Sequence, residues 1–280
     1  MIVTSEIREV RSTRETDKGL SWGFVPTMGY LHDGHLSLVR RARAENERVA
    51  VSIYVNPTQF APNEDLASYP RDLARDLKLL QEAGVDIVFT PADNELYPAG
   101  FQTAVIVSKT AKPLEGASRP THFQGVATIV AKLFNITKPT RTYFGQKDAQ
   151  QCVVVQQMIR DLDFEIEMVV CPTVREGDNL AMSSRNKYLS PAERQSAPAL
   201  YQALLAAQTA YLDGERDGRV LRGIMTDIIG AEPLARIDYV SAADPMTLSE
   251  LDQINNGVLL STAVFFGQTR LIDNIRIVKI

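Results

Sequence analysis

The sequence predicts an α/β protein in which a parallel sheet carries helices on both faces and a smaller α+β domain follows. Through residue 173, short apolar runs rich in β-branched residues alternate with helical segments of about 10–15 residues, which is typical of βαβ units. From residue 174 onward, a polar stretch without periodicity leads to two helices and three β-rich stretches. We therefore expect one domain over residues 1–173 and a smaller one over residues 174–280.

The elements expected in the first domain alternate regularly. The helix over 71–83 has the clearest pattern, because Leu73, Leu77 and Leu80 recur at the spacing of one helical face. Gly84 follows it, where a helix commonly ends. The expected strands cover residues 22–26, 48–55, 86–90, 142–144 and 164–170. The expected helices cover residues 36–45, 71–83, 122–135 and 148–160.

The second domain begins with a polar loop over residues 174–190. Ser190, Pro191 and Glu193 then form a strong helix start, with serine as the cap, proline in the first turn and glutamate completing a capping box. The elements expected after this start are one long helix to about Leu212, a second helix over 219–229, and β-rich stretches near Ile237, over 259–266 and over 271–277.

Composition excludes several classes of protein. The 280 residues are 45% hydrophobic and 23% charged, so a disordered chain and a small disulfide scaffold are ruled out. Lys plus Arg is 30 and Asp plus Glu is 34, and the formal charge of −4 gives no general attraction to nucleic acid or to an anionic membrane. No apolar run approaches the ~20 residues that span a bilayer, and residues 1–9 lack the apolar core of a signal peptide. Cys152 and Cys171 are the two cysteines of the sequence, and so few thiols in a chain of this size are typical of a reducing compartment. We therefore expect a cytoplasmic protein, and the charge balance predicts no nucleic-acid or membrane partner.

A histidine pair lies between the first expected strand and the first expected helix. His32 and His35 belong to the segment PTMGYLHDGH at residues 26–35. Ligands bind at the carboxyl ends of strands in open α/β sheets, and the N–H groups that start a helix suit a phosphate. Residues three apart can meet on one face of a helical turn. We interpret the pair as phosphate-binding. A helix cap is one alternative, and a metal site is another, although no other cluster obviously supplies the further ligands.

The segment GQKDAQQ at residues 145–151 again joins an expected strand to an expected helix. Asp148 can cap that helix, and Lys147 can reach a phosphate as a point charge. The alternative is a lysine that is simply solvated. Its equivalent place beside the histidine segment favours the functional interpretation.

Two loops carry further candidates. Ser183, Ser184 and Arg185 combine two hydroxyls and a guanidinium as an anion clamp, unless the polar loop is an ordinary linker. Asn56 and Gln59 follow the second expected strand, where their neutral amides either bind a polar substrate or form a turn. An anion clamp facing a phosphate site is what nucleotidyl transfer needs, because negative charge develops on the α-phosphate and the leaving pyrophosphate.

Taken together, these segments resemble the AMP-forming pantoate–β-alanine ligases over nearly the whole chain. The HxGH signature alone marks only the wider superfamily of class I aminoacyl-tRNA synthetases and nucleotidylyltransferases, whereas the five segments in this order are specific to the ligases. The resemblance lies in PTMGYLHDGH at 26–35, YVNPTQF at 54–60, RPTHFQGVATIVAKLFN at 119–135, GQKDAQQ at 145–151 and VREGDNLAMSSRN at 174–186.

The resemblance implies a Rossmann-like ATP-binding domain and a smaller C-terminal domain that acts as a lid. It implies ATP-dependent condensation of (R)-pantoate with β-alanine through a pantoyl adenylate, giving pantothenate, AMP and pyrophosphate. It also implies a homodimer, Mg²⁺ bound mainly through the ATP phosphates, and a role in making the precursor of coenzyme A.

The resemblance also implies roles for individual residues. The catalytic residues are His32, His35, Lys147 and Arg185, with His35 as the proton donor. Gln59 binds pantoate and borders the β-alanine site, Gln151 holds pantoate from the opposite side, and Asn56 lies nearby. The ATP-binding residues are Met28, Gly29, Tyr30, Leu31, His32, Asp33, Gly34, His35, Gly145, Gln146, Lys147, Asp148, Val174 through its backbone, Met182, Ser183, Ser184 and Arg185.

One departure and two rival functions stay open. An acidic pair sometimes linked to Mg²⁺ appears here as Arg75-Asp76, so we assign no protein metal ligand. A nucleotidylyltransferase of the HxGH superfamily shares the histidines and the Ser-Arg loop, but it does not need the paired amides Gln59 and Gln151. A non-catalytic nucleotide-sensing module is the other alternative, although the histidines, the lysine and the arginine are all present.

Overall fold

The computed structural model describes residues 1–62 and 64–278, which form two compact units. The first unit comprises Met1–Gly145 and Val154–Pro172, and the second comprises Gln146–Val153 and Thr173–Ile280. The main division after Pro172 lies next to the expected domain boundary. The short segment Gln146–Val153 groups with the second unit rather than with the strand that precedes it.

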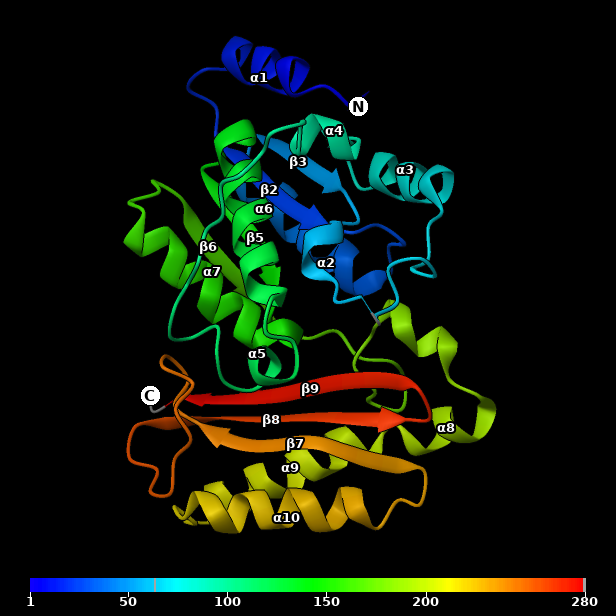
Figure 1. The fold of residues 1–280 in the computed structure, drawn as a ribbon, viewed down its shortest axis with the longest axis vertical. Helices are drawn as coiled ribbons and strands as arrows, with labels where there is room; N and C mark the ends of the chain where they lie inside the picture. Colours follow the sequence, from blue (N-terminus) through cyan, green and yellow to red (C-terminus); the bar gives the residue numbers. More distant parts are fainter. Residues whose placement is uncertain (63, 279–280) are drawn as a thin grey trace. The chain divides into compact units, whose positions relative to one another are not determined.

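The first unit is built on a parallel sheet of six strands in the order β1-β4-β3-β2-β5-β6 (Figure 1). The predicted α/β class is confirmed, because every neighbouring pair in this sheet is parallel. Its strands are β1 (Ile2–Thr4), β2 (Trp22–Thr27), β3 (Arg48–Ile53), β4 (Ile87–Phe89), β5 (Arg141–Gly145) and β6 (Glu167–Cys171).

The strand order reverses at β2. The chain proceeds from β2 through β3 to β4 on one side, and then returns to add β5 and β6 on the other side. In open α/β sheets, ligands bind outside the carboxyl ends of the strands at such a switch point. Here those ends are Thr27 of β2 and Gly145 of β5.

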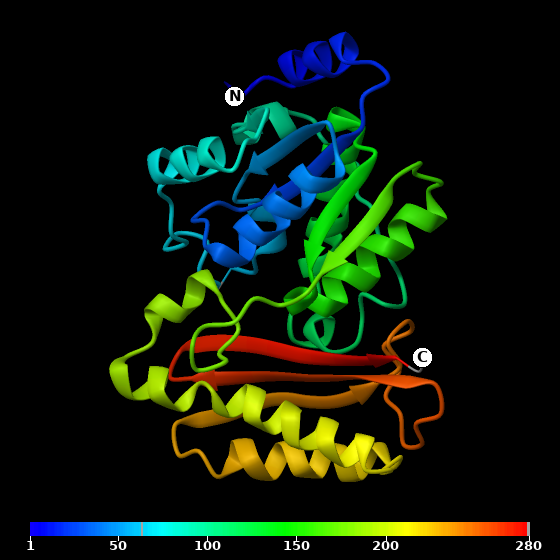
Figure 2. The same cartoon turned by 180° about the vertical axis from the view of Figure 1, so that it is seen from behind.

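Helices cover both faces of this sheet, as Figures 1 and 2 show. Val25 of β2 packs in one hydrophobic cluster with Val39 of α2, whereas its neighbour Phe24 meets Phe134 of α6 edge-on at a centroid distance of 6.5 Å. Successive strand residues point to opposite faces, so α2 and α6 lie on opposite sides. The helices are α1 (Ile7–Thr16), α2 (Asp33–Glu45), α3 (Leu73–Glu82), α4 (Asp93–Leu96), α5 (Glu115–Ser118) and α6 (His122–Thr137), while α7 (Ala149–Asp161) spans both units.

The buried face of α3 differs from the one that the sequence predicts. Leu73 is 45% exposed, whereas Asp76 is only 1% exposed and Leu80 is completely buried. The leucine spacing therefore predicted the helix correctly, but the buried face of the helix contains Asp76 and Leu80 and does not include Leu73. The physical reason is a pair of backbone N–H groups that the Asp76 carboxylate binds, described below. The N-terminal elements β1 and α1 were not predicted at all.

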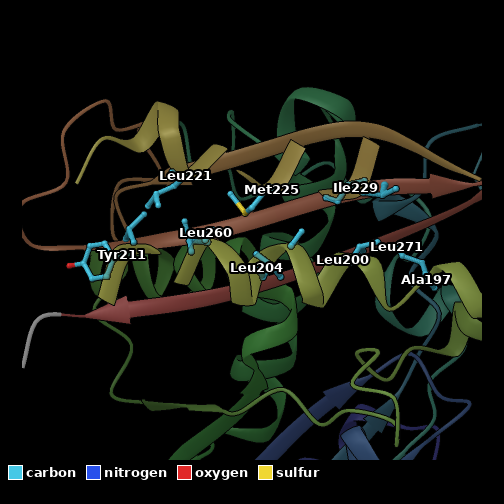
Figure 3. Packing of buried hydrophobic residues seen from close by; sticks show 14 of the residues in the cluster. Ala197, Leu200, Leu204, Tyr211, Leu221, Met225, Ile229, Leu260 and Leu271 are labelled. Carbon is cyan, nitrogen blue, oxygen red and sulfur yellow. The ribbon is translucent and has the colours of Figure 1, made fainter. Parts of the chain in front are cut away.

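The second unit contains an antiparallel sheet, as the expected α+β domain requires. Its strands β7 (Ala235–Ala243), β8 (Gly257–Phe266) and β9 (Thr269–Val278) are adjacent in chain order. Helices α9 (Ala199–Leu212) and α10 (Gly218–Gly230) pack against one face. Figure 3 shows Leu204 of α9, Met225 of α10 and Leu260 of β8 meeting in this core.

The long helix expected from Ser190 to Leu212 is two helices. The capping box is present, because Ser190 N donates to Glu193 Oε2 at 2.8 Å and Glu193 N donates to Ser190 Oγ at 3.4 Å. However, α8 (Pro191–Ser196) ends just before Pro198, which is the cap residue of α9. Proline lacks the N–H that a continuous helix needs, so the chain restarts there.

Among residues 1–62 and 64–278, no helix combines the length and the apolar character needed to cross a bilayer. Cys152 and Cys171 are both buried, and neither forms a disulfide. Burial raises the pKa of the Cys171 thiol, which keeps it in its unreactive protonated form.

Candidate active site

The β2–α2 loop, defined as Met28–Leu31, joins the central strand to α2 at the switch point. Gly29 and Tyr30 both have left-handed backbone conformations, with φ of 84° and 52°. A Cβ on Gly29 would lie 2.9 Å from Ile53 Cγ2, so only glycine fits there. A non-glycine residue such as Tyr30 keeps this conformation only where other contacts hold it.

The histidine pair occupies the start of α2. His32 is the N-cap residue and His35 stands three residues later, and their ring centroids are 4.0 Å apart. The predicted meeting of the two rings on the first turn is confirmed. His32 N donates to His35 Nδ1 at 3.3 Å, so the pair also caps the helix. Because Nδ1 accepts a hydrogen bond, the hydrogen of a neutral His35 is carried by Nε2, which is a donor.

The amide pair after β3 is held in the 3₁₀ turn η1 (Pro57–Gln59). Gln59 Nε2 donates to Met28 Sδ at 3.3 Å, and Asn56 Nδ2 donates to Gln59 Oε1 at 3.1 Å. Asn56 is 1% exposed, and its Oδ1 also accepts from Tyr97 OH at 2.9 Å. The structure therefore brings Met28 and Gln59 together and places Asn56 behind Gln59.

Two residues that we did not single out hold the backbone of Gln59. His122 Nδ1 lies 2.9 Å from Gln59 O, and Arg119 Nη2 donates to the same oxygen at 3.3 Å. Burial, followed by the nearby Arg119 charge, lowers the pKa of His122 to about 4, so the ring is neutral at pH 7. Since a carbonyl oxygen only accepts, the His122 hydrogen is on Nδ1. Arg119 is in turn paired with Glu64 at 2.5 Å.

In the second unit, Asn274 of β9 holds the turn that carries Lys147. This turn is η2 (Gln146–Asp148). Asn274 Nδ2 donates to Gln146 O and to Lys147 O, both at 2.9 Å, and Gln146 Nε2 donates to Asn274 Oδ1 at 2.9 Å. The backbone on both sides of the Lys147 side chain is therefore fixed, while Lys147 Nζ lies 3.5 Å from Asp148 Oδ1.

A buried ion pair holds the loop that begins at Val174. Arg175 donates to both carboxylate oxygens of Asp273, at 2.7 and 3.0 Å, and its guanidinium lies over the Tyr201 ring at 3.6 Å. Burial raises the pKa of Asp273, whereas Arg175 and then Lys147 act to lower it. Met182 N donates to Val174 O at 3.0 Å, so this loop folds back on itself as a hairpin.

The segment expected to be an anion clamp is ordered as the short helix η3 (Ser184–Tyr188). Ser183 caps it, since its Oγ accepts from Arg185 N at 3.2 Å. Ser184 and Arg185 form its first turn and are partly buried. The polar stretch over 174–190 is therefore structured, although its sequence has no periodicity.

Several other predicted residues lie at the ends or in the first turns of these elements, and all of them except the exposed Asp33 are partly buried. Gly145 ends β5, Asp148 ends η2, and Gln151 lies in the first turn of α7. Asp33 and Gly34 open α2 beside the histidines. Within residues 1–62 and 64–278, no group of three or more His, Cys, Asp or Glu residues has the arrangement of a metal site.

The residues that sequence reasoning missed left uneven signals. Asp273 and Asn274 are adjacent polar residues inside the β-rich stretch 271–277, which is an indication that a strand carries a buried polar network. His122 is one of only three histidines. Asp76 appeared in the sequence only as half of the pair Arg75-Asp76, and nothing there pointed to its bonds with the β2–α2 loop.

Comparisons with known proteins agree over nearly the full length. The sequence model of the family described as Pantoate-beta-alanine ligase matches residues 2–276. A pantothenate synthetase of Chloroflexus aggregans is 62% identical over 275 residues, covering 98% of this chain and 99% of the relative. The crystal structure of pantothenate synthetase from Thermus thermophilus is 50% identical with a TM-score of 0.93, covering 98% and 99% of the two chains. The pantoate–β-alanine ligase from Francisella tularensis, crystallised with β-γ ATP and β-alanine, is 36% identical with a TM-score of 0.80, covering 99% and 97%.

Proposed function

Since the chain belongs to the pantoate–β-alanine ligase family, we propose that it makes pantothenate in two steps through a pantoyl adenylate. The overall reaction condenses pantoate with β-alanine at the expense of ATP and forms a carbon–nitrogen bond. The observation that carries the assignment of the site is the contact between Met28 and Gln59. It supports an arrangement in which the loop proposed to line ATP lies beside the amide proposed to bind pantoate.

The first step joins two anions. A pantoate carboxylate oxygen attacks the α-phosphate of ATP, and pyrophosphate leaves with the bonding electrons. The carboxyl is already ionised at pH 7, so the attack needs no general base. The difficulty is charge repulsion, which fixed donors and cations reduce. On the first unit, His32, His35 and the N-terminus of α2 supply donors. On the second unit, Lys147 and Arg185 supply positive charge.

The second step forms the amide. The β-alanine amine, whose pKa is roughly 10, loses one proton before its lone pair attacks the pantoyl carbonyl, and the attached nitrogen releases a second proton to solvent as the amide forms. The bond to the adenylate oxygen then breaks and AMP leaves. Gln59 and Gln151 orient pantoate, and Gln59 also borders β-alanine. Asn56, whose amide is bonded within the protein, serves this proposal by holding Gln59 in place.

The remaining contacts to ATP are assigned by motif. The residues proposed to line ATP are the β2–α2 loop with Asp33 and Gly34, then Gly145, Gln146 and Asp148, and finally Val174, Met182, Ser183 and Ser184. Mg²⁺ binding mainly through the ATP phosphates is consistent with these residues, because Mg²⁺ commonly combines phosphate oxygens with waters and few carboxylates. When bound, it would neutralise part of the phosphate charge.

We also propose a homodimer and a cytoplasmic location. The dimer rests on the family resemblance alone, and sedimentation velocity would measure it. The location is supported by Cys152 and Cys171, which are buried and form no disulfide, because reduced thiols persist in reducing compartments.

The proposed function predicts two separable products. Mg²⁺-ATP with pantoate alone should release about one equivalent of pyrophosphate per site, and adding β-alanine should start continuous AMP release. The measurement is quantification of both products over time. Pyrophosphate release that ignores pantoate, or no release at all, would favour a nucleotidylyltransferase or a nucleotide-sensing module instead.

The amide of Gln59 provides a second prediction. Replacing Gln59 with Ala should raise KM for pantoate by about tenfold, as for loss of one or two hydrogen bonds to a charged ligand. KM for ATP should change much less. Gln81→Ala, at an exposed position of α3, is the matched control. A variant whose ATP dependence changes while its pantoate dependence does not would contradict the assignment.

A further inference from the structure

Asp76 is a buried carboxylate that the proposed chemistry does not use. It lies on α3, far from the β2–α2 loop in sequence, yet Tyr30 N donates to its Oδ2 at 2.7 Å and Leu31 N donates to its Oδ1 at 2.8 Å. Two consecutive peptide N–H groups thus meet the two oxygens of one carboxylate. This is a charge-assisted pair of hydrogen bonds, stronger than two neutral ones.

A third bond comes from the neighbouring residue of α3. Arg75 Nη1 donates to Leu31 O at 2.8 Å, and the Arg75 guanidinium lies 5.6 Å from the centroid of the Tyr30 ring. The first turns of α3 therefore bind the donors and the acceptor of the same short loop. Leu31 immediately precedes His32, so whatever holds Leu31 also sets where α2 and its histidine pair begin.

The loop needs such a hold. Gly29 and Tyr30 both have left-handed backbone conformations, and for tyrosine this conformation is strained relative to ordinary backbone. Asp76 also limits what residue 29 can be, because a Cβ there would approach its Oδ2 to 3.2 Å. Burial of a carboxylate is costly as well, and it is offset only where both oxygens are hydrogen-bonded. Loop and carboxylate therefore stabilise each other.

We propose that Asp76 is a positioning residue for ATP, which holds the β2–α2 loop in the conformation that presents the histidine pair and the α2 N-terminus to the phosphates. The proposal rests on the proposed function, since it assumes that this loop binds ATP. It gives Asp76 a role through the loop backbone, with both of its oxygens bound to protein N–H groups.

Asp76→Asn is the sharpest test. One oxygen becomes an NH₂ group, which faces a backbone N–H and cannot accept from it. We expect kcat/KM for ATP to fall about 10²-fold, as for a small misplacement of reacting groups. The affinity for ATP, measured calorimetrically with excess Mg²⁺, should weaken while KM for pantoate changes little. Hydrogen exchange should quicken at the amides of Tyr30 and Leu31.

The matched control is Asp72→Asn, the same change at the exposed cap of the same helix. Asparagine caps helices as well as aspartate does, so no kinetic change is expected. If Asp76→Asn does not fold, Arg75→Met removes the third bond and should raise KM for ATP and loop exchange by a few fold.

Unchanged loop exchange and ATP affinity in Asp76→Asn would overturn the proposal. A raised Mg²⁺ requirement with unchanged loop exchange would overturn it in favour of a metal ligand. Failure of the unaltered protein to bind ATP or make pantothenate would instead refute the proposed function, so the two failures are distinguishable.

Discussion

Replacement of His35 by alanine is expected to lower turnover at least ~10²-fold, a typical loss when a charge-stabilising donor is removed. The structural reason is the position of the hydrogen on the His35 ring. His35 Nδ1 accepts from His32 N, so Nε2 carries the hydrogen and is oriented by that bond. An imidazole held in this way presents a fixed donor to the charge that grows on the α-phosphate. Steady-state turnover at saturating substrates measures the loss.

Two further variants separate this role from helix capping. The His35→Gln variant keeps an N–H donor near the Nε2 position and should recover part of the activity. Loss of the helix cap alone lowers the free energy of unfolding by about 1 kcal/mol, which thermal unfolding experiments measure. Arg40→Ala, on the same helix in an exposed ion pair with Asp33, is the control and should be nearly silent. A folded His35→Ala protein with near-normal turnover would refute the assignment.

Lys147→Ala should lower kcat/KM for ATP by about 10²-fold, because it removes the positive charge of the side chain. The backbone that carries this side chain is held in place by Asn274. A preorganised charge stabilises the leaving pyrophosphate without reorganisation as the reaction proceeds. Lys147→Arg keeps the charge but not the compact ammonium, so partial activity is expected. The measurement is kcat and KM for ATP with pantoate and β-alanine saturating.

The control for Lys147 is Lys109→Ala, which removes an exposed lysine of the first unit. It changes the net charge equally and should leave kinetics unchanged. The assignment fails if kcat/KM for ATP is unchanged in Lys147→Ala, or if only KM for pantoate changes. Thermal unfolding of both variants shows whether any loss arises from folding rather than from the site.

Much of the fold was predictable because local patterns carry it. The alternation of strands and helices placed β2 through β6 and α2 through α7 within a few residues, apart from the short α4 and α5. The capping box at Ser190 was predicted and is present. The prediction of one long helix after Ser190 was wrong, although Pro198 in the sequence is a reason for a break. The short N-terminal strand and helix lacked a pattern strong enough to assign.

The candidate site divides in the same way. Motif spacing selected His32, His35, Gln59, Lys147 and Arg185, and the geometry brings His32 to His35 and Gln59 to Met28. Their roles remain proposals that the variants above test. The supporting residues Asp76, Asn274 and His122 were not selected, because each acts on a segment far away in sequence.

By itself, then, the sequence determined the α/β class, the order of elements and the segments that carry the chemistry, since these depend on spacing between near neighbours. Only the tertiary structure decided that Asp76 faces inward and that Asn274 holds the Lys147 turn. The physical reason is hydrogen-bond satisfaction. Partly buried and buried polar groups must find partners, and the partners of Asp76 and Asn274 come from distant elements that meet only when the chain folds.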